Sequence, residues 1–426
     1  MAKEFTHDIP MPDEGKIMEK CYNAGPMLSN DKEGFTAEDS IMKIVSDVSE
    51  SGYRDYLDKL RRAGYSITNE NEQYGDLFAE AGEMHIAYRK KRGEIRVIRD
   101  AVKTPLDEFS YTASGGNKTT VYQYGLYYDK ANACTKTTIN CGMFYIIRLC
   151  DGGLVMIDGG HRIQWSNEAF EGLWEFLCGI TGNTGRVRIA AWYFTHAHDD
   201  HTDGCTRLLR AHGAEIDLER VMFNFPSYKT VRGSYSDTVF DMKKTVAEIY
   251  PHAKLLKVHS GQKIRLADAE FEFIYTHEDA VNADDPEKFP PRDFNCTSSV
   301  VKFTVGGKSI MFLGDTNVET EAILAETTER ELWKSDFVQV AHHCFNYLDT
   351  LYEWIDAPMA MLPNSYFGGH TPENTPKLEG VLKHLSPRDN IYYEGEGTYG
   401  FDPAENGWKM TYSAPVIGGE YDGEPL

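Results

Sequence analysis

Short, nearly continuous apolar runs dominate the chain from about residue 119 onward. The run at 187–194, VRIAAWYF, is typical of a strand that is buried on both faces. MFYIIRL and LVMID predict two strands joined by a turn at 150–153, and DGCTRLLRAHG predicts a helix that ends at Gly213. VVKFTVGGKSIMFLGD predicts a hairpin with Gly306 and Gly307 at its turn. Because strands and helices alternate, we expect two mixed sheets covered by helices.

The first hundred residues have a different texture. We expect an irregular arm over 1–35, because this stretch is rich in Pro, Gly and Met and has no clear period. Thr36 and Asp39 form a plausible cap for a helix over 36–50, and apolar spacing predicts a second helix over 53–64. The runs MHIAYRK and EIRVI predict a hairpin around Gly93. These elements predict a small α+β unit over 36–110, a linker over 111–118 and a larger domain over 119–426. Nothing in the small unit resembles a reactive constellation, so we expect a structural appendage.

Composition narrows the classes of function. The 426 residues carry 66 acidic and 44 basic side chains, a formal charge of −22, and such a surface repels nucleic acid. The first residues lack the apolar core of a signal peptide, and no apolar run is long enough to span a membrane. Eight cysteines without CxxC spacing indicate reduced thiols, with Cys344 as a buried filler. We therefore expect a cytoplasmic protein that acts on a small molecule, without a nucleic-acid or membrane partner; the oligomeric state stays open.

Three of the apolar strands end in side chains of the metal-ligand type. If the three strand ends lie at one edge of the fold, these side chains converge on rigid elements. They are His196, His198, Asp200 and His201 after the first strand, Asp315 after the second, and His342 and His343 after the third.

The types of these side chains indicate which metal ions they could bind. Zinc prefers neutral imidazole nitrogen and carboxylate oxygen. His196 and His198 stand two residues apart and can face one cation, whereas Asp200 and His201 can serve a second. Asp315 can bridge both cations. Two divalent cations roughly 3.5–4 Å apart share a hydroxide and lower its pKa towards 7. We therefore expect two divalent metal ions, zinc first, with manganese or iron as alternatives.

The order of these motifs resembles the metallo-β-lactamase fold superfamily over about residues 119–412. The similar motifs are MIDGGH with Asp158, the HxHxDH run, LGDT with Asp315 and VAHH with the late histidine. The resemblance implies a four-layer αββα sandwich, an α/β fold, with a dinuclear site at one edge. It also implies that Asp200 holds a metal and orients the nucleophile, and that Asp158 supports the site from behind.

The superfamily has one further histidine ligand between HxHxDH and Asp315. His277 is favoured because FEFIYTHED places it just after a strand, where the superfamily carries this ligand. The other histidines in this interval that compete for the role are His212, His252 and His259.

The double histidine is similar to the branch that contains phosphorylcholine esterase and the DNA-uptake domain. That likeness implies His343 as a metal ligand and His342 as a proton donor or oxyanion contact, although the two roles can be exchanged. If the strand continues through them, the two side chains point in opposite directions. In the same branch, stretches such as those around Asn295, Ser299 and His370 flank the site. Asn295 and Ser299 can equally serve as turn residues that bind backbone.

Aromatic residues also gather near the predicted site. They can form a cage for a substrate headgroup or simply pack the loops. They are Tyr228, Tyr235, Phe345, Tyr347, Tyr366 and Phe367.

These features favour a metallo-hydrolase that uses a metal-bridged hydroxide on a small phosphoric ester. His198 stands where flavodiiron proteins carry Glu, and Asp315 stands where zinc β-lactamases commonly carry Cys or His, so both of those activities are disfavoured. A carbonyl hydrolase acting on an ester, lactone or thioester is the first alternative. A non-catalytic binding protein is the second.

Overall fold

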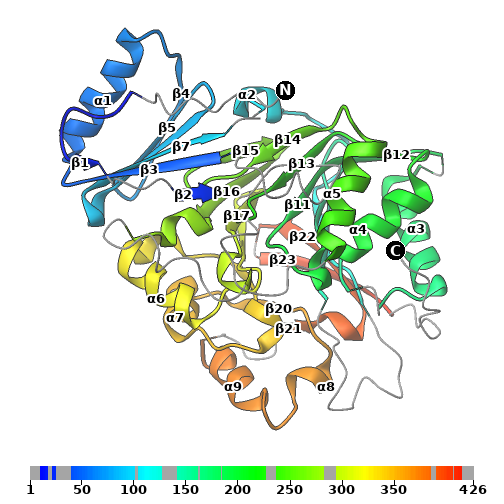
Figure 1. Ribbon diagram of the computed structural model, residues 1–426. Coiled ribbons are helices and arrows are strands. Elements are labelled where there is room, and N and C mark those ends of the chain that lie inside the picture. The colour runs from blue at the N-terminus through cyan, green and yellow to red at the C-terminus, as the bar shows by residue number, and fades with distance from the viewer. Residues whose placement is uncertain are drawn as a thin grey trace.

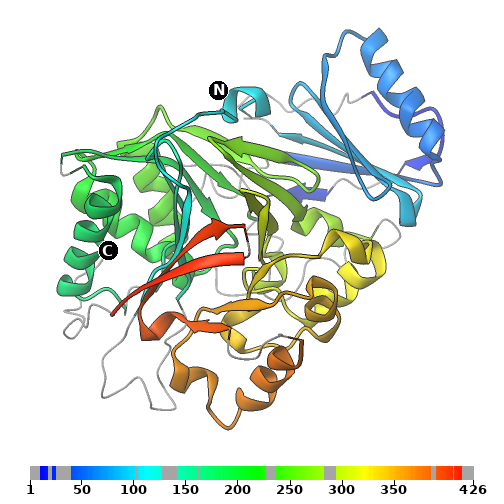
Figure 2. The ribbon, with the colours of Figure 1, turned by 180° about the vertical axis from the view of Figure 1, so that it is seen from behind.

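The computed structural model describes residues 10–17, 22–24, 40–100, 104–126, 142–161, 164–183, 185–226, 237–282, 294–384, 390–405 and 407–414 (Figures 1 and 2). Most of the predicted arm, the proposed cap at Thr36 and Asp39, Tyr228 and Tyr235 lie outside these residues, as does the side chain of Phe367. Within the described residues, no helix is both long enough and apolar enough to cross a membrane.

Two mixed β-sheets form the centre of the molecule. The nine-stranded sheet has the order β14-β13-β11-β10-β9-β8-β22-β23, with β12 beside β11. Its strands are β8 (Thr120–Gln123), β9 (Phe144–Arg148), β10 (Leu154–Asp158), β11 (Val187–Phe194), β12 (Ile216–Leu218), β13 (Arg220–Phe223), β14 (Lys254–Lys257), β22 (Thr398–Ala404) and β23 (Gly407–Ser413).

The second sheet has seven strands in sequence order, from β15 to β21. They are β15 (Lys263–Leu266), β16 (Ala269–Tyr275), β17 (Val300–Val305), β18 (Lys308–Phe312), β19 (Phe337–Gln339), β20 (Met359–Leu362) and β21 (Ile391–Tyr393). The predicted hairpin is confirmed, because Gly306 and Gly307 both have positive φ between β17 and β18. A turn of that kind matches the twist of the strands that it joins.

The two sheets pack face to face. Tyr145 and Ile147 of β9 point into the core shared with Phe303 and Phe312 of the second sheet. The alternate residue Ile146 points the other way, into the core beneath the helices. Both faces of β9 are therefore buried, which explains why its sequence is apolar without alternation.

Helices cover the outer faces of both sheets (Figures 1 and 2). α3 (Asn167–Thr181), α4 (Asp199–His212) and α5 (Asp237–Ile249) pack on the nine-stranded sheet. α6 (Val318–Thr327), α7 (Asp349–Ile355) and α9 (Thr375–His384) pack on the seven-stranded sheet. The α/β fold and its four-layer αββα sandwich are thus confirmed. Shorter helical segments are α2 (Leu106–Phe109), α8 (Tyr366–Gly369), η2 (Lys90–Arg92), η4 (His277–Ala280), η5 (Phe294–Thr297), η6 (Arg330–Leu332), η7 (Ala341–Cys344) and η8 (Glu394–Glu396).

The N-terminal unit is a seven-stranded sheet covered on one face by α1 (Glu50–Arg62). Ser49 caps α1 by accepting a hydrogen bond from the Gly52 N–H, and Tyr53, Leu57 and Leu60 face the sheet. This helix and the hairpin around Gly93 were predicted correctly. The strands are β1 (Lys16–Ile17), β2 (Tyr22–Ala24), β3 (Ser40–Ser46), β4 (Ile67–Gln73), β5 (Asp76–Ala81), β6 (Met84–Arg89) and β7 (Glu94–Asp100).

The helix predicted over 36–50 is wrong, because Ser40–Ser46 forms strand β3 between β1, β2 and β7. Ile41, Met42, Ile44 and Val45 are all buried, so both faces of the strand are covered. A segment that is apolar on both sides has no clear period, and its pairing partners decide its conformation.

A buried polar junction joins the N-terminal unit to the sandwich. The Arg96 guanidinium donates to the carbonyl oxygens of Glu278 and Val281, and Arg89 pairs with Asp279. Further contacts join Ser40, Glu80 and Asp100 of the unit to Lys257, His259 and Gln262 of the sandwich. A Cβ on Gly261 would lie 2.1 Å from the Phe78 ring, so only glycine permits this approach. The unit is therefore packed against the sandwich through charges that water cannot reach.

A candidate dinuclear metal centre

The predicted ligands lie where strands of both sheets end. β10, β11 and β13 run parallel in the first sheet, and Asp158 and His196 follow the carboxyl ends of two of them. In the second sheet, Asp315 follows β18 and His343 follows the parallel strand β19. Since the two sheets pack face to face, these strand ends meet across one edge of the sandwich.

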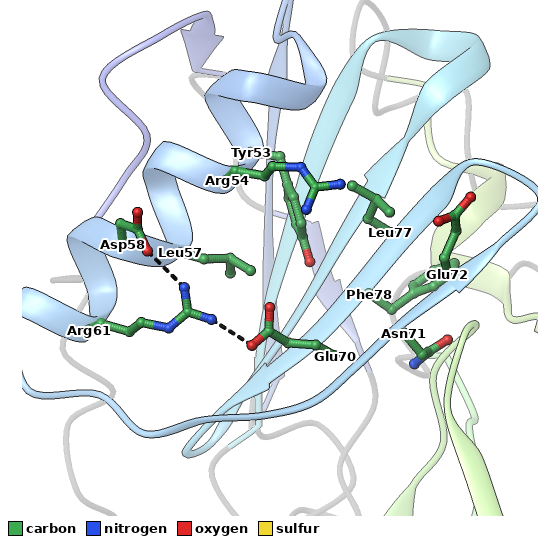
Figure 3. A pocket seen from close by; sticks show the side chains of 10 residues that line it. All are labelled: Tyr53, Arg54, Leu57, Asp58, Arg61, Glu70, Asn71, Glu72, Leu77 and Phe78. Atoms are coloured by element: carbon green, nitrogen blue, oxygen red, sulfur yellow. Dashed lines mark hydrogen bonds and ion pairs between the residues drawn. The ribbon is translucent and has the colours of Figure 1, made fainter.

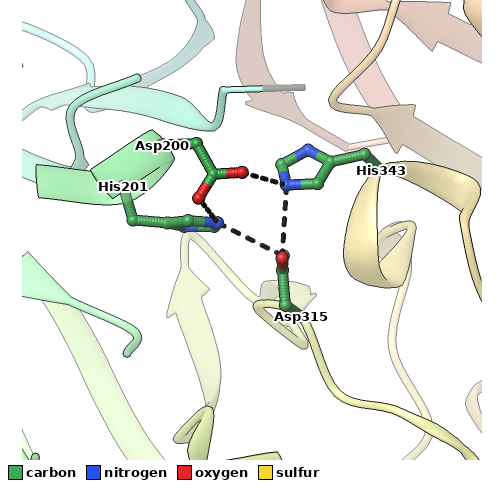
Figure 4. A group of neighbouring side chains, drawn as sticks. All are labelled: Asp200, His201, Asp315 and His343. Atoms are coloured by element: carbon green, nitrogen blue, oxygen red, sulfur yellow. Dashed lines mark ion pairs between the residues drawn. The ribbon is translucent and has the colours of Figure 1, made fainter. Parts of the chain in front are cut away.

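Seven side chains of the predicted site are brought together here, in addition to Asp158. Asp200, His201, Asp315 and His343 form one group whose ligand atoms lie within 4.8 Å of one another (Figure 4). His196, His198 and Asp315 form a second such group. Asp315 belongs to both, as a bridging carboxylate would. The seventh side chain, His342, lies beside Asp315 and belongs to neither group.

Distances in the first group show how closely its polar atoms converge. His343 Nε2 lies 3.4 Å from Asp200 Oδ2 and 3.3 Å from Asp315 Oδ2. His201 Nε2 lies 3.4 Å from Asp315 Oδ1. Both Nε2 atoms and Asp315 Oδ1 are buried and make no hydrogen bond within the described residues. Buried polar atoms that converge without hydrogen bonds suit a cation, which accepts nitrogen and oxygen donors together.

Charge in the group also favours a cation. Burial alone would raise the pKa of Asp315, but the charges of His343 and His201 hold it well below its usual range. Conversely, burial would lower the pKa of His343, but the Asp315 and Asp200 carboxylates beside it raise it to about 10. The charges of His201 and His343 also hold the pKa of Asp200 well below its usual range, so both carboxylates stay ionised and favour positive charge between them.

Asp158 stands behind His201 and fixes its ring. Its Oδ2 accepts from His201 Nδ1 at 2.7 Å and from the Thr195 hydroxyl at 2.8 Å, while Oδ1 accepts from the Thr195 N–H. This leaves His201 Nε2 facing the ligand group. Asp158 has a φ of 58°, and a Cβ on Gly204 would lie 2.0 Å from the Gly159 carbonyl oxygen. The turn after β10 thus presses against α4, and the glycine permits that contact.

We expect Asp158→Asn to weaken metal binding by about 10–100-fold without lowering the metal content at saturation, because the ring of His201 loses the carboxylate that orients it. Titration of the metal-free protein with Zn²⁺, followed by elemental analysis, measures both quantities. A loss of one metal equivalent at saturation would instead make Asp158 a direct ligand.

Sequence reasoning missed the side chains that tie the two ligand turns together. Gln339 Oε1 accepts from the N–H groups of Leu313 and Gly314, and its Nε2 donates to the Gly314 carbonyl. The Ser298 hydroxyl accepts from the Asp315 N–H at 3.0 Å. A polar Gln inside the buried strand FVQV was the signal that could have revealed this role, because a buried amide must find partners.

The double-histidine segment does not continue the strand. β19 ends at Gln339, and His342, His343 and Cys344 have φ values of 49°, 52° and 67°. Three successive non-glycine residues with positive φ store strain that the surrounding contacts must offset. The condition for opposite orientations of the two histidines is therefore not met, and both Nε2 atoms lie near Asp315 Oδ2, at 3.8 Å and 3.3 Å.

His342 lies at the rim of the group. Its side chain is 22% exposed, against 1% for His343. Asn346 Nδ2 contacts its Nδ1 at 2.6 Å, and Asn295 Nδ2 lies 3.2 Å from its Nε2. Asn295 thus lies beside His342 in the structure.

Four other predicted positions are placed as follows. Within the described residues, His277 joins neither ligand group, and its Nε2 contacts Asn224 Oδ1 at 2.9 Å beside the junction. Burial lowers the pKa of His277 to about 4. Ser299 donates to the Thr195 carbonyl. The Tyr347 hydroxyl donates to Asp349, and exposed His370 stacks on Tyr366 with ring centroids 4.0 Å apart.

One further group adjoins the site. His161, Asp199 and Asp203 place their polar atoms within 4.8 Å of one another beside the HxHxDH turn, and the sequence did not single them out. Cys344 is fully buried, and burial raises the pKa of its thiol to about 12, in keeping with a filler.

Neither a protein-family model nor a curated protein matches this chain in sequence. Among solved structures, YhfI from Bacillus subtilis, a metallo-β-lactamase fold protein, is similar at 10% identity and a TM-score of 0.40, over 70% of this chain and 100% of that one. A diphosphatase of the PhnP family is similar at 16% identity and 0.33, over 65% and 94%. Zn²⁺-bound PqqB from Methylobacterium extorquens is similar at 9% identity and 0.32, over 52% and 72%. Likeness at this level concerns the fold, so the site rests on this chain's own side chains.

Proposed function

We propose that this protein is a metal-dependent hydrolase with two divalent cations, which acts on a small phosphoric ester. The observation that carries the proposal is the position of Asp315 in both ligand groups. A carboxylate shared by two groups of imidazoles has little use in a structural site, because a structural zinc closes its shell with four side chains.

Asp200, His201, Asp315 and His343 would hold one cation, and His196, His198 and Asp315 the other. Bound there, zinc, manganese or iron would polarise the ester as a Lewis acid and lower the pKa of water. The protein's own part is to fix the ligands: Asp158 orients His201, and Gln339 holds the turn that carries Asp315. Ligands held this firmly are ready for the substrate without rearrangement.

His342 is the side chain placed to meet the substrate. Its side chain is 22% exposed, and contacts with Asn346 and Asn295 hold its ring. In this position its imidazolium donates a proton to the leaving group or contacts the developing charge on a phosphoryl oxygen. The likeness of the AHH segment to the phosphorylcholine esterase branch favours a phosphoric ester.

The purified protein should hydrolyse bis(p-nitrophenyl) phosphate. EDTA should abolish turnover, and Zn²⁺ or Mn²⁺ should restore it, with elemental analysis giving two metal equivalents per chain. A fully loaded protein that leaves every phosphoester intact but opens a lactone or cleaves a thioester would overturn the substrate class and favour the carbonyl hydrolase. Metal content near zero in protein purified without chelator would favour the binding protein.

Mutation of the two neighbouring histidines should have different effects on metal content and on kcat. We expect His343→Ala to lower the metal content by about one equivalent, because His343 belongs to one ligand group. We expect His342→Ala to keep both equivalents and to lower kcat by roughly 100-fold, the range of a general acid. Metal analysis together with kcat at saturating substrate measures both, and the reverse pattern would exchange the two roles.

A further inference from the structure

A pocket with a volume of about 440 Å³ lies in the N-terminal unit, between α1 and strands β4 and β5 (Figure 3). None of these elements contributes a side chain to the metal groups. The size falls within the range of small-molecule sites. Tyr53 and Leu57 of α1 and Leu77 and Phe78 of β5 supply its apolar lining, and each of the four is buried. An occupant therefore needs an apolar body.

The rim of the pocket carries an excess of negative charge. Arg54 pairs with Glu50 at 2.7 Å, and Arg61 pairs with both Asp58 and Glu70, at 2.8 and 2.5 Å. Both guanidinium groups are thus already matched by carboxylates. Glu72 also lines the pocket, and among the described residues no ion pair engages it. An occupant with a positive charge would therefore balance the excess of carboxylates at this rim.

Two polar atoms of lining residues have no hydrogen-bond partner within the described part of the chain. They are the Tyr53 hydroxyl and Asn71 Oδ1, both buried. Figure 3 shows the Tyr53 hydroxyl directed into the space between Leu57 and Leu77. Asn71 Nδ2 donates to the Gly261 carbonyl of the sandwich at 3.1 Å, so the Asn71 side chain lies on the other face of the sheet, and the Tyr53 hydroxyl is the unpartnered group on the α1 face. A buried acceptor without a donor costs stability, and a ligand N–H would offset that cost.

We propose that this pocket binds a small organic amine: an ammonium group that meets Glu72 and the Tyr53 hydroxyl oxygen, attached to an apolar chain or ring that lies on Leu57 and Leu77. An ammonium is a donor only, and here every open polar atom can accept. The face of Tyr53 adds attraction for a cation. The site is separate from the metal groups, so the proposal stands apart from the hydrolase activity.

The test uses isothermal titration of the full chain with 2-phenylethylamine at constant salt. Its matched probes are 2-phenylethanol, which lacks the charge, and 3-phenylpropanoate, which reverses it. We expect the amine to bind at least tenfold more tightly than either, and Glu72→Gln to weaken the amine about tenfold. Tyr53→Phe removes only the unpartnered hydroxyl and keeps the apolar lining, so we expect a folded protein with about threefold weaker binding. Glu326→Gln, an exposed charge change on α6, should leave binding unchanged.

Several outcomes would overturn the proposal. One is equal binding of the amine and the alcohol, which would reduce the site to an apolar surface. Another is amine binding that survives both Glu72→Gln and Tyr53→Phe, which would place the amine elsewhere on this acidic protein. The third is the absence of heat and of any rise in Tm up to 10-millimolar amine, on the order of the weakest small-ligand affinities.

Discussion

Asp315→Asn will lose both metal ions, whereas a change to a ligand that serves a single group will lose one. Asp315 is the only residue common to both groups among the described side chains, and it is 1% exposed. The amide keeps the volume but removes the charge that offsets two cations. We expect kcat/KM to fall by more than about 100-fold, beyond the effect of residues that only orient a ligand. Elemental analysis and turnover of bis(p-nitrophenyl) phosphate measure the two effects.

Controls for this variant come from the same chain. His196→Gln should lower the metal content by one equivalent. The change Asp107→Asn at an exposed position of α2 should alter neither the metal content nor turnover. Thermal unfolding establishes that each variant is folded. Retention of one full equivalent by Asp315→Asn would mean that Asp315 serves one cation only, and the dinuclear assignment would fail.

Arg96→Met will lower the free energy of unfolding by about 3–5 kcal/mol, because the buried Glu94 carboxylate loses its close partner and keeps only the longer contact with Arg92 at 3.4 Å. Arg96 is 1% exposed, and its guanidinium donates to Glu94 Oε1 at 2.6 and 2.9 Å. The same group satisfies the carbonyl oxygens of Glu278 and Val281 across the junction. Urea unfolding of the metal-free protein measures the change.

The matched control is Arg54→Met on α1. Its ion pair with Glu50 is 64% and 53% exposed, so the change should cost less than about 1 kcal/mol. In the double variant Glu94→Gln with Arg96→Met, part of the loss should return, because the buried carboxylate is removed together with its closest partner. If Arg96→Met and Arg54→Met cost the same, the junction contributes nothing beyond a surface contact.

The sequence predicted that these side chains converge, because each segment that carries them comes just after an apolar strand. A strand end fixes where a side chain sits, and HxHxDH, LGDT and AHH keep their order along the chain. The alternation of strands and helices predicted two mixed sheets covered by helices, and the four-layer order was implied by the resemblance of the motifs to metallo-β-lactamase fold proteins. These features depend on local patterns, which a single sequence displays.

Features that depend on contacts between distant segments of the chain could not be predicted from the sequence. The residues of β3 resembled the start of a helix, because no local sequence pattern shows that this segment pairs with β7. His277 follows a strand as expected, but its side chain contacts Asn224, which is distant in sequence, and the adjacent Glu278. These contacts place it beside the junction. The turn at His342 and His343 depends on positive φ values that non-glycine residues rarely adopt. Contacts made by Gln339 and Gly314 support that turn, and no pattern in AHHC reveals it.

The strand ends that meet around Asp315 also bear on how the chain assembles. His196 and His201 follow a strand of the first sheet, and Asp315 and His343 follow strands of the second, so more than a hundred positions separate the two halves of the centre. Neither half alone supplies enough side chains to bind a cation tightly before the two sheets have packed together. Metal binding would therefore come late in folding. Ions bound there would cross-link the two layers much as a disulfide does, and their concentration in the cell would add to the lifetime of the native state.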